Sequence, residues 1–81
     1  MDRIEEQVVR LKKEFRDQLE RAQKEAGIGT RELADRAGLG AATVYFWKAG
    51  RSFPRLETLV MIGEILGKDI EIKLVDKEGS A

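Results

Sequence analysis

The fold of this chain is decided by the stretch TRELADRAGLGAATVYFWKA, residues 30–49. It predicts two short helices, one over 30–37 and one over 41–49. Gly38 interrupts the helical pattern and Gly50 ends it, because glycine takes the left-handed backbone conformation that closes a helix at little cost. We therefore expect two helices joined by a tight turn.

Two further helices flank this pair. Residues 2–26 carry apolar side chains at spacings of three and four, mostly separated by charged residues, and Gly27 ends that pattern. The apolar stripe is formed by Ile4, Val8, Leu11, Phe15, Leu19 and Ala22. The second flanking helix follows Pro54, spans 56–66 and ends at Gly67. On or near its buried face we expect Leu56, Leu59, Val60, Ile62, Gly63 and Leu66.

The first helix is long for a small domain. Its second half, residues 15–26, should pack against the other helices, whereas its first half has little domain left to cover. Two alternatives remain open for the first half. It projects into solvent, or its Ile4–Val8–Leu11 edge meets another chain.

After Gly67 the hydrophobic period changes. Residues 69–76, DIEIKLVD, alternate polar and apolar side chains, which predicts one half-buried β-strand. A lone strand needs partners for its backbone groups. The expected partner is the same strand of a second copy, related by a two-fold axis, and the alternative is an extended tail lying over the helices. The expected dimerisation residues are Ile70, Ile72 and Leu74.

The composition excludes several classes of site. A chain of 81 residues forms one domain at most, and it has neither cysteine nor histidine. Disulfides, Cys/His metal sites and imidazole or thiol chemistry are therefore excluded. No Gly-rich phosphate loop is present, so we expect no enzyme, no cofactor and no metal. No signal peptide or bilayer-spanning run is visible, and we expect a cytoplasmic protein without a membrane partner.

Charge is balanced but segregated. Fifteen Lys and Arg offset fifteen Asp and Glu, for a net charge of zero. No acidic residue lies between Asp35 and Glu57, whereas that stretch carries Arg36, Lys48, Arg51 and Arg55. The basic segment overlaps the two central helices, which favours a polyanionic partner.

Residues 27–59 resemble the helix-turn-helix of the lambda-repressor-like, XRE/Cro-type family. The resemblance covers about 19–66 and rests on Leu33-Ala34, Gly38, Thr43-Val44, Trp47, Gly50-Arg51, Pro54 and Leu56-Glu57-Thr58-Leu59. It implies a mostly α, lambda-repressor-like helix-turn-helix domain, here with a long N-terminal helix and one C-terminal strand. In this family the helix over 41–49 enters the major groove of double-stranded DNA.

Five of the matching residues have structural reasons. Ala34 lies where the two central helices cross closely, and Gly38 needs a positive φ in the turn. Leu33, Val44 and Trp47 should face the core. Together they fix the angle at which the second central helix is presented.

By match to the family, the base-facing positions are Gly40, Ala41, Ala42, Tyr45 and Phe46. The family usually places Ser, Arg, Gln or Asn there, so this chain departs from the pattern. Its small and aromatic side chains can contact thymine methyl groups but offer no bidentate pair to guanine or adenine. For Tyr45 and Phe46 the alternative is packing inside the protein.

The expected phosphate contacts come from the same unit and from the residues that follow it. The family commonly has Gln at position 30 and an acidic residue at position 48, so Thr30 and Lys48 depart from the family pattern. For each cation the alternative is an ordinary solvated charge. The set is Thr30, Thr43, Lys48, Arg51 and Arg55.

The C-terminal alternation narrows the resemblance to HipB-like antitoxins, in which the strand pairs across the dimer. Phage repressors and the controller proteins of restriction–modification systems share the rest. We expect a homodimeric, repressor-type transcriptional regulator that binds a palindromic operator. The alternative is a protein-interaction module or antitoxin that acts mainly by binding a partner protein, such as a cognate toxin.

The expected organisation has four parts. An N-terminal extension of the first helix covers 1–18, and the DNA-binding domain covers 19–67. The dimerisation strand follows over 68–76, and a frayed tail over 77–81.

Overall fold

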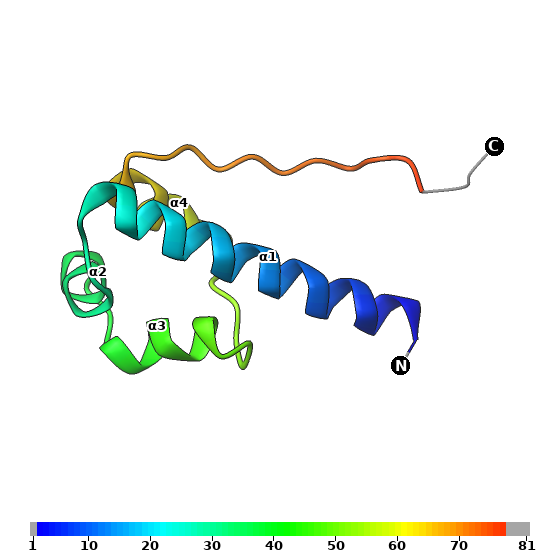
Figure 1. Cartoon of the computed structure of the whole chain (residues 1–81), viewed down its shortest axis with the longest axis horizontal. Helices are drawn as coiled ribbons and strands as arrows, with labels where there is room; N and C mark the ends of the chain where they lie inside the picture. The colour runs from blue at the N-terminus through cyan, green and yellow to red at the C-terminus, as the bar shows by residue number, and fades with distance from the viewer. Residues whose placement is uncertain (1, 78–81) are drawn as a thin grey trace.

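A computed structural model describes residues 2–77 of the chain, and these contain four helices (Figure 1). Their bounds agree with the expected ones to within one residue, so the mostly helical fold is confirmed. Within 2–77 no helix combines the length and hydrophobicity needed to cross a membrane. The helices are α1 (Arg3–Ala26), α2 (Thr30–Ala37), α3 (Ala41–Lys48) and α4 (Leu56–Leu66).

Helix α1 begins and ends at residues suited to those positions. The Asp2 carboxylate accepts a hydrogen bond from the Glu5 amide at 2.8 Å, which satisfies a donor without a partner inside the helix. At the other end Gly27 has φ 69°, and the Ile28 amide donates to the Gln23 carbonyl at 3.0 Å. This closure directs Ile28 into the core.

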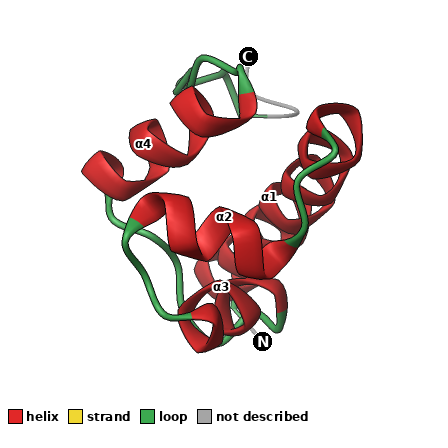
Figure 2. Ribbon diagram, turned by 90° about the vertical axis from the view of Figure 1, so that its left-hand side faces the viewer, coloured by secondary structure: helices red, strands yellow, loops and turns green. Residues whose placement is uncertain are grey.

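Gly38 forms the turn between α2 and α3. Its φ is 72°, the positive value expected from the sequence, and the Leu39 amide donates to the Ala34 carbonyl at 2.8 Å. A Cβ at Gly38 would meet no atom within 4 Å. The backbone conformation, rather than a lack of space, therefore selects glycine. The turn sets the angle between the two helices (Figure 2).

One hydrophobic core joins all four helices. The predicted scaffold is confirmed, because Leu33, Ala34 and Val44 are completely buried and Trp47 almost so. Trp47 meets the half-buried Phe15 of α1 edge-on, with ring centroids 6.4 Å apart. The core consists of Leu19, Ala22, Ile28, Leu33, Ala34, Ala37, Val44, Trp47, Ile62 and Leu66.

Helix α4 buries a narrower face than expected. Ile62, Gly63 and Leu66 are buried, but Leu56 and Val60 are about half exposed, so their assignment to the buried face is wrong. The reason is geometric. Residues 62 and 66 are one turn apart and define the buried stripe, whereas Leu56 and Val60 lie on its flank, where no other helix covers them.

The first half of α1 extends beyond the other three helices (Figure 1). Its apolar edge stays exposed at Ile4, Val8 and Leu11 in the single chain. The second half behaves as expected, since Leu19 and Ala22 are buried. The single chain therefore leaves a projecting arm with an apolar stripe.

After α4 the chain runs back alongside α1 as an extended segment (Figure 1). The expected strand over 68–76 is not formed, since no strand occurs within 2–77. The physical reason is that a strand requires a second backbone to bond, and one chain supplies none. Pairing with a second copy stays a prediction. Of the expected tail 77–81, residues 78–81 lie outside the described part of the chain.

The segment is attached to the domain at its start. The Lys68 amide donates to the Gly63 carbonyl at 2.8 Å, and the Lys68 ammonium lies 2.6 Å from the Glu25 carboxylate. Gly63 permits this close approach, because a Cβ there would lie 2.5 Å from the Lys68 carbonyl oxygen and 3.3 Å from Ile70 Cδ1. The attachment fixes the direction in which the segment leaves the domain.

Candidate nucleic-acid interface

Helix α3 presents two different faces. Val44 and Trp47 point into the core, and the intervening Tyr45 and Phe46 point outward with exposed fractions of 52% and 46%. Packing of these two rings inside the protein, the alternative left open by the sequence, is thereby excluded for the single chain. The aromatic pair is supported from behind by a rigid core.

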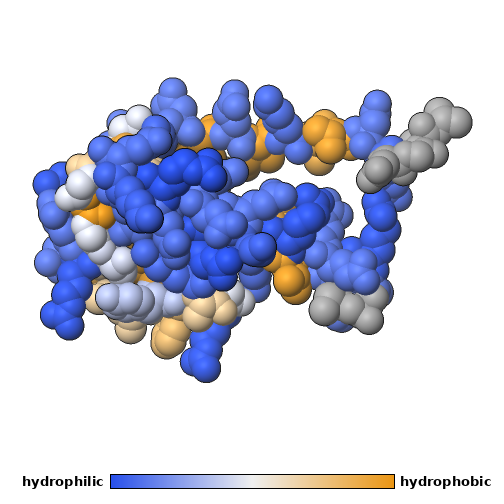
Figure 3. Space-filling view, in the orientation of Figure 1, coloured by the Kyte–Doolittle hydropathy of each residue, from blue (hydrophilic) through white to orange (hydrophobic). Residues whose placement is uncertain are grey.

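The remaining base-facing candidates extend this outward surface. Gly40 and Ala42 are exposed, whereas Ala41 and Thr43 are half-buried at the start of the helix. No residue of α3 has an amide or guanidinium group in its side chain. Apolar colour marks part of this face along the lower edge of the molecule (Figure 3). The helix therefore offers methyl and ring contacts and two hydroxyl groups.

Two arginines follow α3 in the chain, and one of them lies beside an aromatic ring of the helix. The Arg51 guanidinium carbon lies 5.9 Å from the centroid of the Phe46 ring, within reach of a cation–π contact. Arg55 is exposed at the start of α4. Neither arginine forms a salt bridge within residues 2–77, whereas Arg36 of α2 is paired with Glu32 at 2.6 Å. The positive charges beside α3 are thus not neutralised by a neighbouring carboxylate.

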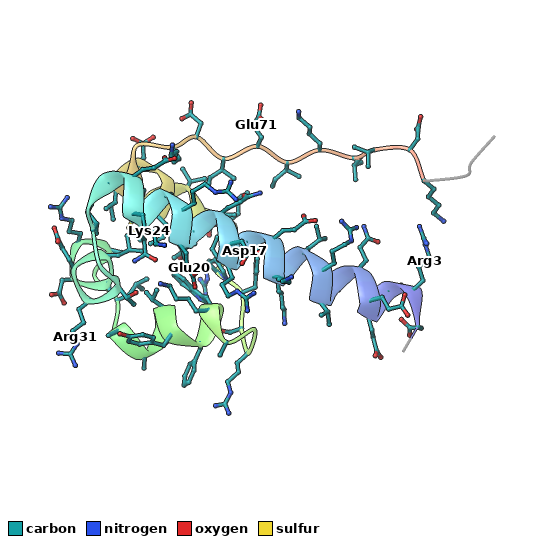
Figure 4. The ribbon with its side chains drawn as sticks, in the orientation of Figure 1. Arg3, Asp17, Glu20, Lys24, Arg31 and Glu71 are labelled. Atoms are coloured by element: carbon teal, nitrogen blue, oxygen red, sulfur yellow. The ribbon has the colours of Figure 1, made fainter. Side chains whose placement is uncertain are left out.

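Thr30 and Lys48, separate in sequence, come together at the start of α2. The Lys48 ammonium donates to Thr30 Oγ1 at 2.9 Å, so Lys48 is half-buried and anchored instead of freely solvated. The Gln23 side-chain amide lies 3.4 Å from the same oxygen and 3.3 Å from the Ile28 carbonyl. Arg31, the next residue, points away from the domain (Figure 4). This polar cluster links α1, α2 and α3 at the start of α2.

The sequence did not predict the contacts of two residues in this region, Gln23 and Lys12. Gln23 is buried, and its Oε1 accepts no hydrogen bond from residues 2–77. Lys12 of α1 places its ammonium 3.4 Å from the Gly50 carbonyl oxygen, across 38 positions of sequence. Neither hydrophobic period nor motif spacing signals such pairs, because both depend on how α1 crosses the other helices.

The dimerisation candidates lie away from this surface, on the extended segment. Ile70 is half-buried against Gly63, Ile72 is 73% exposed and Leu74 is fully exposed. They do not contact the candidate DNA-reading residues, so the two predicted roles occupy separate regions of the molecule.

The surface around α3 is suited to binding a polyanion. Exposed aromatic side chains lie at its centre, and Arg51, which forms no salt bridge within 2–77, lies beside them. Within 2–77 no group of acidic, histidine or cysteine side chains could hold a metal ion. Such an arrangement fits a helix placed in a duplex groove, where base edges lie between two rows of phosphates.

Comparison with known proteins agrees with this geometry. Residues 17–80 match the family model of the bacteriophage CI repressor helix-turn-helix domain, which is most of the chain. No curated protein and no solved structure matches the chain. The matched family consists of DNA-binding regulators and not enzymes, and the expected lambda-repressor-like resemblance is confirmed. The chain belongs to the bacteriophage CI repressor helix-turn-helix domain family.

Proposed function

We propose that the chain is a transcriptional repressor that binds a palindromic operator as a homodimer, with α3 lying in the major groove. The observation that carries this proposal is the outward face of α3. Exposed Tyr45 and Phe46 stand there with Arg51 beside the Phe46 ring, and neither Arg51 nor Arg55 has an acidic partner within 2–77. A helix of this kind fits the major groove, and its flanking cations reach the phosphates.

The contacts divide into two sets. Ala42, Tyr45 and Phe46 meet base edges, where methyl groups of thymine are the apolar partners. Lys48, Arg51 and Arg55 meet phosphates, assisted by the hydroxyl groups of Thr30 and Thr43. Because the base-facing set lacks bidentate hydrogen-bonding groups, sequence preference comes from thymine methyls and from DNA shape.

The homodimer is supported by the extended segment. Ile70, Ile72 and Leu74 alternate with polar residues, and the segment has the unpaired backbone of a strand without a neighbour. Two copies related by a two-fold axis carry two α3 helices. The operator is then a palindrome with half-sites about one DNA turn, roughly 10 bp, apart.

The experiment selects operator DNA from a random duplex library with the full chain. The selected sequences should be palindromic at the stated spacing, and they should bind two chains per duplex. A scrambled duplex of the same length and base composition is the matched control. Selection of no sequence over the scrambled duplex, or binding of one chain to a single half-site, would contradict the proposal.

A second candidate function is supported by exposed apolar side chains. Tyr45 and Phe46 on α3 are large apolar side chains that lie exposed, and exposed apolar side chains of this kind often bind another protein, such as a cognate toxin. In that case Lys48→Ala and Arg51→Ala variants should bind duplex DNA as the unmodified chain does. A loss of DNA affinity in both variants favours the repressor instead.

A further inference from the structure

Two arms leave the domain in the same direction, the first half of α1 and residues 68–77 (Figure 1). An open groove of about 650 Å³ lies between them and α4. Its lining is largely apolar and includes Leu11 and Phe15 of α1, Leu59 of α4, and Ile70 and Ile72 of the segment. The family match covers residues 17–80, so it includes the segment but not the first half of α1.

The segment turns its apolar side toward α1. Glu71 points away from α1 (Figure 4). Orange apolar atoms lie on the inner side of the segment and blue polar groups on its outer side (Figure 3). In an extended chain, alternate residues point to opposite sides, so Ile70, Ile72 and Leu74 share the inner side. Ile72 and Leu74 are nevertheless largely exposed, because the groove is open.

The backbone beyond Lys68 has no partners. Lys68 makes the last main-chain hydrogen bond found outside the helices, and none joins residues 69–77 to another part of 2–77. An extended segment with free amides and carbonyls and one apolar side is a template for another strand. The strand that suits it must bring an apolar side of matching spacing and complementary charge.

We propose that a second copy of this chain fills the groove, its segment pairing antiparallel with the first in a register centred on Ile72. The inference deepens the proposed homodimer and rests on it. In this register the two Ile72 residues face each other on the two-fold axis. Ile70 faces the partner's Leu74, and the apolar sides of both strands point toward the α1 helices.

Charge complementarity selects this register. Glu71 and Lys73 share the outer side of the segment, their charged atoms 4.0 Å apart. Centring the pairing on Ile72 puts Glu71 opposite the partner's Lys73, and two-fold symmetry forms this pair twice. Lys68 likewise faces the partner's Asp76. Opposite charges directly across a sheet stabilise it, and like charges destabilise it.

Neighbouring registers lose these contacts. Centring on Glu71 or on Lys73 sets two like charges against each other. A shift that places Ile72 opposite a charged residue turns the apolar side of one strand to the polar side of the other. The Ile72 register alone keeps the isoleucines together while pairing Glu71 with lysine.

The paired strands also give the projecting half of α1 a role. Ile4, Val8 and Leu11 continue the apolar stripe of the helix, and Leu11 lines the groove together with Ile72. A two-stranded ribbon is marginal on its own and needs an apolar surface beneath it. The exposed stripe of α1 provides that surface, so both arms are parts of one interface.

The test uses Glu71→Lys and Lys73→Glu variants of the full chain, compared by analytical ultracentrifugation. Each variant alone creates two like-charged pairs, and its dimer dissociation constant should rise on the order of tenfold. An equimolar mixture should recover the dimer as a heterodimer, because both cross-strand pairs are again opposite in charge. The double variant should recover it as a homodimer.

A thiol at the axis gives an independent readout. The chain has no cysteine, so Ile72→Cys introduces a single thiol that should form a disulfide-linked dimer on mild oxidation, since directly opposed residues lie close enough. Val75→Cys is the matched control. It is also largely exposed, but in this register it faces the partner's Asp69 and lies far from its own copy.

The α1 contribution is tested by Val8→Asp against Val9→Asp. Both side chains are exposed in the single chain, but only Val8 belongs to the stripe. Val8→Asp should weaken the dimer at least tenfold with unchanged helix content by circular dichroism, and Val9→Asp should not. Equal effects of the two variants would overturn the role of α1.

Three results would overturn the proposal as a whole. They are a monomeric chain at all concentrations, no recovery in the charge-swapped mixture, and equal crosslinking at positions 72 and 75. If operator binding by two chains persists while the mixture fails to recover, the register is refuted and the repressor function stands. If the mixture recovers but no operator is selected, the function fails and the interface stands.

Discussion

Replacing Arg51 with glutamine removes one of the three cations proposed to contact phosphate in each copy. The three are Lys48, Arg51 and Arg55, so a homodimer makes six such contacts. Counterion release then predicts that a plot of the logarithm of the binding constant against the logarithm of the salt concentration has a slope of about −5.4. For the variant, which makes four contacts, the slope should be about −3.6. Extrapolated from 1 M salt, the difference corresponds to a roughly 30-fold loss of affinity at 0.15 M salt.

The measurement is fluorescence anisotropy of a labelled operator duplex titrated at several KCl concentrations. Arg36→Gln is the matched control, because its guanidinium is already paired with Glu32 at 2.6 Å and lies outside the proposed set. That variant should retain the full slope. If Arg51→Gln also retains it, Arg51 does not contact phosphate and the position of α3 on DNA deduced from it is wrong.

Four further outcomes are expected. Replacing a thymine that faces α3 by deoxyuridine should weaken binding about fourfold, because burying one methyl group contributes roughly 0.8 kcal/mol; equal affinities in a competition titration would exclude methyl reading. Leu33→Ala should lower the free energy of unfolding in urea by about 3 kcal/mol, because Leu33 is completely buried, and a loss below about 1 kcal/mol would contradict that packing. Gly38→Ala should cost about 1–2 kcal/mol in the same assay since φ is 72°, whereas Gly40→Ala, at φ −72°, should cost clearly less. A hydrogen bond from Lys68 and the charge of Lys68 lower the pKa of Glu25 below its usual range. The contact therefore stabilises the fold at pH values above the ordinary glutamate pKa, and this stabilisation is lost as the pH falls through the lowered pKa. Lys68→Ala should raise the NMR titration midpoint of Glu25, and an unmoved midpoint would show that Lys68 is not the cause.

The hydrophobic pattern and the glycine positions were sufficient to predict the helices and where they end. Glycines at 27, 38 and 67 adopt positive φ at helix ends, as their places in the hydrophobic pattern predicted. The α2–α3 scaffold could be read from Leu33 and Val44, because its residues are close in sequence. These features depend on backbone conformation and short-range packing, which a sequence determines directly.

Features that depend on the crossing of distant elements were not predictable. The Lys48–Thr30 hydrogen bond requires the position of α3 relative to α2, and the Lys12–Gly50 contact requires the position of α1 relative to the residues that follow α3. The exposure of Leu56 arises because no further helix covers that flank of α4. A strand at the C-terminal end needs a second chain, which no single sequence supplies.

The division of α3 into a buried face and an exposed one has a consequence for how operator choice can change. Tyr45 and Phe46 contribute little to the core, whereas Val44 and Trp47 are almost completely enclosed. Substitutions on the outer face should therefore leave stability nearly unchanged, so under the proposed binding mode a new target sequence can be acquired one residue at a time on an intact scaffold. A repressor built this way can diverge rapidly from its relatives in the DNA that it regulates.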